Sequence, residues 1–122
     1  MATIVVVEDQ PDNLKLFTAL LTMNGHQVIG LAGGERLVDT LRSHRPVPAL
    51  ILLDIQLPGR DGFELLEDIR KIEGDHPWKV VALTAHAMPG DMEKAIAAGF
   101  DGYITKPIEV RNFPGEVARY LG

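Results

Sequence analysis

The 122-residue chain has the length of one domain, and its 46% hydrophobic and 24% charged residues are typical of a globular protein rather than a disordered one. Its 12 Lys and Arg against 17 Asp and Glu give a net charge of -5, so charge offers no reason to bind nucleic acid or an anionic membrane. With no cysteine, no signal peptide and no apolar run near the roughly 20 residues that cross a bilayer, we expect a single domain over residues 1–122 in the cytoplasm.

The first half of the chain predicts two strand and helix pairs. Residues 3–7 are β-branched and apolar, which favours a central strand. Pro11 suits the first position of a helix that ends near Gly25. A second strand over 26–32 and a short helix over 35–43 follow, separated by the turn Gly33 and Gly34.

The middle of the chain predicts a strand covered on both faces. Residues 50–53 are four apolar residues without polar alternation, as in a parallel sheet with helices on each side, and Asp54 ends the run. Pro58 and Gly59 then turn the chain away. Asp61 resembles an N-cap, with Glu64 three residues later, for a helix that runs to Ile72.

The second half continues the alternation. We expect strands at 80–83, ending in Thr84, and at 102–104, and helices at 91–98, closed by Gly99, and at 113–121, with Asn112 as cap and Pro114 in the first turn. Helix packing is the expected role of the stripe Met88, Met92 and Ile96. Together the elements predict an α/β fold, a doubly wound five-stranded parallel sheet with five helices.

Polar residues follow four of the predicted strands at their carboxyl ends. They are Glu8, Asp9, Asp54, Thr84 and Lys106. In a parallel sheet these ends meet at one edge, where ligands bind. Three close carboxylates favour a hard cation such as Mg²⁺, while an ammonium and a hydroxyl suit a phosphoryl group, whose transfer is mainly positioning and charge neutralisation. We therefore expect a site that receives a phosphoryl group on an aspartate.

The sequence resembles the receiver domain of two-component response regulators over essentially its whole length. The spacings are 45 residues from Asp9 to Asp54, 30 to Thr84 and 22 to Lys106. The matching segments are Val7 Glu8 Asp9, Leu53 Asp54 Ile55 Gln56 Leu57 Pro58 Gly59 with Asp61 Gly62, Ala82 Leu83 Thr84 Ala85, Ala98 Gly99, and Tyr103 Ile104 Thr105 Lys106 Pro107. The segments at Glu8, Asp54 and Thr84 are most similar to receivers of hybrid kinases and of stand-alone cell-cycle regulators.

The resemblance implies a flavodoxin-like receiver fold and a phosphoacceptor at Asp54. A histidine kinase or histidine phosphotransferase would be the donor, and an unidentified downstream protein would read the signal. Asp9 and Asp54, with Glu8 and the backbone carbonyl of Gln56, would hold Mg²⁺, for which Mn²⁺ is a possible substitute. The chain would assist its own phosphorylation and dephosphorylation without being an enzyme that acts on other molecules.

The resemblance also implies roles around the phosphoryl group. Thr84 and Lys106 would bind its oxygens, and Tyr103 would turn inward as Thr84 moves toward it. The bond before Pro107 would be cis, which is tolerated essentially only before proline. We further expect Gln56 and His86, two residues beyond Asp54 and Thr84, to tune how long the phosphoryl group persists.

Two alternatives remain open at this point. A haloacid-dehalogenase-like Mg²⁺-dependent phosphatase also places an aspartate and a lysine at strand ends, but typically needs a second aspartate as general acid where Gln56 stands. The chain is alternatively a receiver cut from a larger hybrid kinase or regulator, although Met1 and the end at Gly122 slightly favour a complete single-domain regulator.

Overall fold

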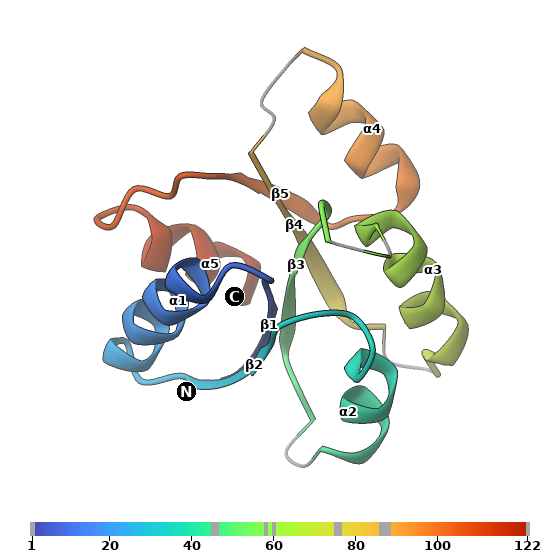
Figure 1. The fold of residues 1–122 in the computed structure, drawn as a ribbon, viewed down its shortest axis with the longest axis horizontal. Coiled ribbons are helices and arrows are strands. Elements are labelled where there is room, and N and C mark those ends of the chain that lie inside the picture. The colour runs from blue at the N-terminus through green and yellow to red at the C-terminus, as the bar shows by residue number, and fades with distance from the viewer. Residues whose placement is uncertain are drawn as a thin grey trace.

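The computed structural model describes residues 2–44, 47–57, 59, 61–74, 77–85 and 89–121. Five strands and five helices alternate within these residues (Figure 1). In chain order they are β1 (Thr3–Val7), α1 (Pro11–Met23), β2 (Gln27–Leu31), α2 (Leu37–Ser43), β3 (Leu50–Asp54), α3 (Gly62–Ile72), β4 (Lys79–Thr84), α4 (Asp91–Ala98), β5 (Gly102–Thr105) and α5 (Phe113–Leu121).

The strands form one parallel sheet in the order β2-β1-β3-β4-β5. Helices α1 and α5 cover one face, and α2 and α3 cover the other, with α4 standing further out beside β5 (Figure 1). This arrangement confirms the predicted doubly wound α/β fold. The order reverses between β1 and β3, so the crevice at their carboxyl ends is where such sheets bind ligands.

Strands β1 and β3 are buried on both faces, as their unbroken apolar sequence predicts. Successive side chains point to opposite faces, so Val5 and Ile51 join the core beneath α2 and α3, whereas Val6 and Leu52 join the core beneath α1 and α5. The second core includes the stacked rings of Phe17 and Phe113, whose centroids lie 5.3 Å apart. These two cores hold the central strands in place, and with them the carboxyl edge.

Element boundaries differ from the expected ones by one or two residues. The strand predicted over 26–32 is shorter at each end, and α2 begins at Leu37 because residues 35 and 36 form a turn. Strand β4 begins at Lys79, which pairs with Leu50, and β5 extends to Thr105, which pairs with Thr84. No helix in the described ranges is long and apolar enough to span a membrane.

Helix α4 corrects one expectation from the sequence. Met92 and Ile96 are 54% and 48% exposed, so the predicted packing of this stripe is wrong for both residues. Ala95 is the only residue of α4 that is buried. Met88, the third member of the stripe, lies outside the described residues. Residues 92 and 96 do lie one helical turn apart on α4, but the residue that this helix buries is Ala95.

The N-cap of α3 lies at the expected position, and the residue expected to cap α5 lies directly before that helix. The Asp61 side chain accepts a hydrogen bond of 2.9 Å from the Glu64 N–H, as an N-cap does. Before α5, the backbone carbonyl of Asn112 accepts from the Glu116 N–H, while its side-chain amide donates to Glu109. Pro114 lies in the first turn of α5, where its missing N–H costs no helical bond.

We predict that Asp61→Ala lowers the free energy of unfolding by about 1 kcal/mol, because it leaves an N–H at the start of α3 without its acceptor. Denaturant unfolding of the variant measures the loss. Glu67→Ala, an exposed position within the same helix, is the matched control and is expected to change stability by less than about 0.5 kcal/mol. Equal losses in the two variants would contradict the capping role.

Candidate functional site

Four strand ends bring the predicted polar residues to one edge of the sheet. Glu8 and Asp9 follow β1, Asp54 ends β3, Thr84 ends β4 and Lys106 follows β5. The strands are in register here, because Val7 pairs with Leu53 and the Ile55 N–H extends the ladder to Leu83. The sequence positions therefore converge because the sheet is parallel and its edge is even.

Three carboxylates meet at this edge. One oxygen from each of Glu8, Asp9 and Asp54 lies within 4.8 Å of the others, the one such group of three or more metal-ligating side chains in the described part of the chain. Glu8 is 0% and Asp54 is 1% exposed, whereas Asp9 is half-buried. Buried like charges are unfavourable without a neutralising partner. The group consists of hard oxygen donors, so it fits a cation such as Mg²⁺ in type and number.

Lys106 lies between two of these carboxylates. Its Nζ is 2.8 Å from Asp54 Oδ2 and 2.9 Å from Glu8 Oε1, and its side chain is only 12% exposed. The backbone N–H of Lys106 donates to the Thr84 carbonyl at 2.7 Å, which continues the pairing of β5 with β4. The Lys106–Pro107 peptide bond is cis, as the resemblance implies.

Both partners of the buried ion pair between Glu8 and Lys106 have a shifted pKa. Burial raises the pKa of Glu8 and the nearby Asp54 charge adds to the rise, although hydrogen bonds from the Gln10 N–H and Lys106 oppose it. Burial alone would lower the pKa of Lys106, but its hydrogen bonds to Asp54 and Glu8 outweigh that cost and raise it. Lys106 is consequently a cation at neutral pH, and its stabilising effect is lost only when the pH rises above its ordinary pKa.

Backbone N–H groups bind the second carboxylate oxygen of Asp54 and of Glu8. The Gln56 N–H donates to Asp54 Oδ1 at 2.8 Å, and the Gln10 N–H donates to Glu8 Oε2 at 3.0 Å. Asp54 therefore has one oxygen on Lys106 and the other on the loop that follows β3. Gly62 lets α3 start against this loop, because a Cβ there would lie 2.5 Å from the Ile55 Cα.

The acidic group opens into a cavity of about 300 Å³. Its lining consists of Asp9, Gln10, Asn13, Asp54, Gln56, Ala85, Lys106 and Pro107. Sequence reasoning missed Gln10, Asn13 and Ala85 as site residues. A usable signal existed for Asn13, since it lies in the first turn of a helix that was predicted to begin at Pro11, two residues after Asp9. Asp54, although only 1% exposed, is one of the residues that line this cavity.

Thr84 does not line this cavity. It is fully buried and instead lines a neighbouring cavity of about 500 Å³ together with Ile55, Gln56, Asp61, Phe63, Asp91 and Lys94. Gln56 is exposed and borders both cavities. His86, the other predicted tuning residue, lies outside the described residues.

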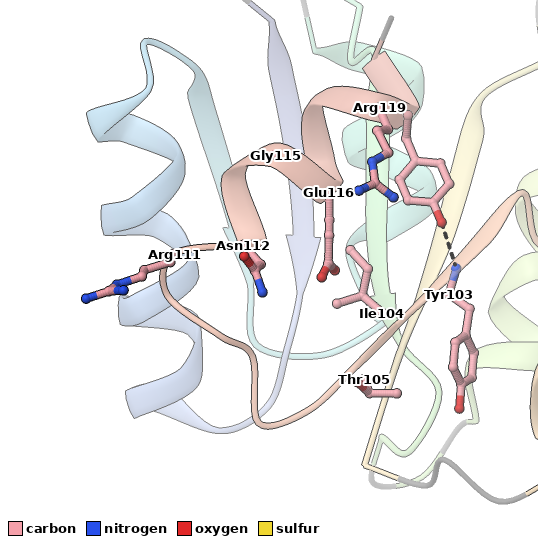
Figure 2. A pocket seen from close by; sticks show the side chains of 9 residues that line it. Tyr103, Ile104, Thr105, Arg111, Asn112, Gly115, Glu116 and Arg119 are labelled. Atoms are coloured by element: carbon pink, nitrogen blue, oxygen red, sulfur yellow. Dashed lines mark hydrogen bonds between the residues drawn. The ribbon is translucent and has the colours of Figure 1, made fainter.

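Tyr103 lies on β5 with its ring on the α3 and α4 side of the sheet. The ring is half-buried against the core beneath α2 and α3, and its pKa is raised by burial and by the carboxylates of Asp91 and Glu93. Figure 2 shows it turned away from a separate cavity of about 600 Å³ between β5 and α5. The Tyr103 N–H donates to the Tyr120 hydroxyl at 3.4 Å on that other side (Figure 2).

Comparisons with known proteins agree with this geometry. A model of the response regulator receiver domain matches residues 4–117. The polar-differentiation response regulator DivK of Brucella anthropi is 38% identical over 120 residues, which cover 98% of this chain and 96% of DivK. The same similarity extends to DivK of Brucella abortus.

Solved structures of receiver domains are also similar to this chain. The receiver domain of the sensor histidine kinase PA1611 from Pseudomonas aeruginosa, solved with a magnesium ion in its active-site cleft, aligns with a TM-score of 0.85 at 32% identity over 99% of this chain and 98% of its own. The chemotaxis protein CheY4 of Vibrio cholerae, 22% identical over 99% of both chains, shares the fold with a TM-score of 0.89. The chain therefore belongs to the response regulator receiver domain family.

Proposed function

We propose that the chain is a signalling switch in which Asp54 accepts a phosphoryl group in a Mg²⁺-dependent reaction. The observation that carries the proposal is the carboxylate of Asp54, which is buried, lines an open cavity and has one oxygen 2.8 Å from the Lys106 ammonium. Family membership supports the same reading. Glu8, Asp9, Asp54 and the backbone carbonyl of Gln56 would hold the metal.

The proposed transfer needs little from the protein beyond position and charge. An Asp54 oxygen forms a bond to phosphorus while the bond from phosphorus to the donor nitrogen breaks, and the electron pair stays on the imidazole, which takes up a proton. Lys106 would neutralise the phosphoryl oxygens, and the Thr84 hydroxyl would donate a hydrogen bond to one of them after moving from the neighbouring cavity. When bound, Mg²⁺ would supply further charge neutralisation at the acidic group.

The proposed donor is a histidine kinase or a histidine phosphotransferase, and the proposed reader is a downstream protein. Similarity to DivK and to the receiver of a sensor histidine kinase supports this class of partner. We propose a single receiver domain over residues 1–122. The exchange would take place in the cytoplasm.

The phosphatase alternative has weaker support. Residue 56 is a glutamine whose side chain cannot deliver a titratable proton, and its N–H serves to hold Asp54. The proposed role is therefore a phosphoacceptor that promotes its own phosphorylation and dephosphorylation. Repeated turnover of a generic phosphatase substrate would instead support the phosphatase function.

The first prediction from the proposed function concerns the phosphoacceptor. Incubation with acetyl phosphate and Mg²⁺ is expected to add one phosphoryl group per chain, read by intact mass, and Asp54→Asn is expected to abolish the gain because an amide is not a nucleophile toward phosphorus. Glu67→Gln on the exposed side of α3 is the control and should label as the wild type does. A mass gain that persists in Asp54→Asn would contradict the assignment of Asp54 as the phosphoacceptor.

The second prediction concerns the proposed switch residue Tyr103. The chain has two tyrosines, so in the Tyr120→Phe variant Tyr103 is the only source of phenolate absorbance. Its pKa is expected above that of a free tyrosine, and Asp91→Asn should lower it because a nearby negative charge is removed. Glu93→Gln should lower it less, since Asp91 contributes more. If neither carboxylate matters in an alkaline titration, the ring does not face α4 in solution.

The third prediction concerns the lifetime of the phosphoryl group. We expect the double substitution Gln56→Ala and His86→Ala to change the dephosphorylation rate, because the family resemblance implies that the residues two positions beyond Asp54 and Thr84 flank the path of an attacking water. The decay of the phosphorylated mass over time measures it. Thr18→Ala, on α1 outside the acidic cavity, serves as control. An unchanged dephosphorylation rate in the double variant would contradict the proposed role of Gln56 and His86.

A further inference from the structure

Strand β2 is an edge of the sheet that the described residues leave open. Gln27 and Gly30 are exposed and the other residues of β2 are half-buried, whereas every residue of β1 beside it is buried. Val28 and Ile29 point to opposite faces of the sheet, yet both line one cavity of about 380 Å³. That cavity therefore lies against the free edge of the strand.

The pairing with β1 determines which main-chain groups of β2 can bond elsewhere. The Gln27 N–H donates to a carbonyl just before β1, and the Leu31 carbonyl accepts from an N–H just after it. Alternate residues of a parallel ladder bond to the neighbouring strand, so Ile29 between them also faces β1. The N–H and the C=O of Val28 and of Gly30 consequently point outward, where another strand can bond to them.

The opposite edge of the sheet, at β5, is covered. The Tyr103 N–H donates to the Tyr120 hydroxyl at 3.4 Å, and the Tyr120 ring occupies the space where a Cβ on Gly102 would lie. Lys106 and Pro107 follow the strand directly. Proteins commonly keep an edge strand from pairing by covering it or by placing lysine and proline there. Strand β2 contains neither a charged residue nor a proline.

The surface around β2 also lacks charge. No Lys, Arg, Asp or Glu occurs over residues 16–34, in a chain of which 24% is charged. This segment includes the larger part of α1 and all of β2, and Met23 at the end of α1 is 81% exposed. Two copies of a chain with a net charge of -5 can approach along this segment without bringing like charges into contact.

A second copy of β2 matches the edge in register. If two antiparallel β2 strands are related by a two-fold axis through Ile29, Val28 of each copy lies opposite Gly30 of the other. Each such pair exchanges both of its outward main-chain hydrogen bonds, so none of these groups is left unbonded. Val28 and Gly30 share one face of the strand, so each Val28 side chain covers the space beside a glycine.

Helix α1 extends the same surface. It lies over β2, because a Cβ on Gly30 would lie 3.2 Å from the Leu14 side chain. Thr22 lines both the cavity at β2 and a largely apolar groove of about 650 Å³ along α1, which Leu14 and Met23 also line. In the two-fold arrangement the α1 helices run antiparallel on one face of the joined sheet. Met23 of each copy then lies toward the Leu14 end of the other groove.

We propose that two copies of the chain associate through antiparallel pairing of their β2 strands, which joins two five-stranded sheets into one. Main-chain hydrogen bonds set the register, and the apolar groove of α1 supplies the buried area. The association is separate from the phosphoacceptor role, because β2 contributes no residue to the acidic group or to the cavity beside it.

Sedimentation equilibrium over a series of protein concentrations tests the association. The average mass of the wild type is expected to rise toward twice the monomer mass. Met23→Lys should raise the dissociation constant at least several-fold, because it places a charge against the apolar groove of the other copy. Met92→Lys is the matched control, since it makes the same change at a 54% exposed methionine on α4 and should associate as the wild type does.

Disulfide formation tests the register. The chain has no cysteine, so Ile29→Cys introduces one thiol per copy, and the two thiols meet at the two-fold axis. Directly opposed residues at a non-hydrogen-bonded position have Cα atoms about 4.5 Å apart, within the range of a disulfide. Val28→Cys is the control, because the two copies of residue 28 are more than about 7 Å apart, too far to be bridged. Mild oxidation should give a covalent dimer of Ile29→Cys alone.

Each outcome decides for or against the pairing. A wild type that remains monomeric at about 1 mM overturns the proposal. It is also overturned if Met23→Lys and Met92→Lys weaken association equally, or if only Met92→Lys does, which would place the contact at α4. Equal cross-linking of the two cysteine variants contradicts the register. Both methionines are exposed, so the sedimentation result stands even if a cysteine variant fails to fold.

Discussion

The ammonium of Lys106, placed between the carboxylates of Asp54 and Glu8, is the interaction on which the rest of the site depends. Without it, two buried negative charges would face each other at a strand edge with no counter-charge from the described residues. Burial by itself would lower the pKa of Lys106, but its hydrogen bonds to Asp54 and Glu8 raise it. The same ammonium is positioned where a phosphoryl group on Asp54 would need a positive charge, so stability and the proposed chemistry use one side chain.

The fold supplies this geometry through an even parallel edge. The central strands are buried on both faces, which leaves their carboxyl ends as the place where polar residues emerge. Because β5 pairs with β4 through Thr105 and Thr84, Lys106 emerges level with the acidic group although it lies 98 residues from Glu8 in the chain.

Much of this arrangement could be predicted from the sequence, because strand periodicity, proline and glycine positions are local signals. The helix at 91–98 and its closure by Gly99 were predicted with the observed bounds. The ion pair of Lys106 with Glu8 was not, since pairing across the sheet depends on register and not on local pattern. For the same reason the ion pair of Arg70 with Asp101 was missed, as the two residues are 31 positions apart. Met92 and Ile96 were misplaced because periodicity identifies a helix face but not what covers it.

A double-mutant cycle on Lys106 and Asp54, measured by denaturant unfolding at neutral pH without metal, tests the central claim most directly. Lys106→Met should destabilise the fold by about 3–5 kcal/mol, because it leaves buried carboxylates unpaired. Asp54→Asn in that background should recover part of the loss, since one repelling charge is removed, with a coupling of at least about 1 kcal/mol. Additive effects of the two substitutions would contradict the account, because Lys106 would then not be what balances the buried acidic group.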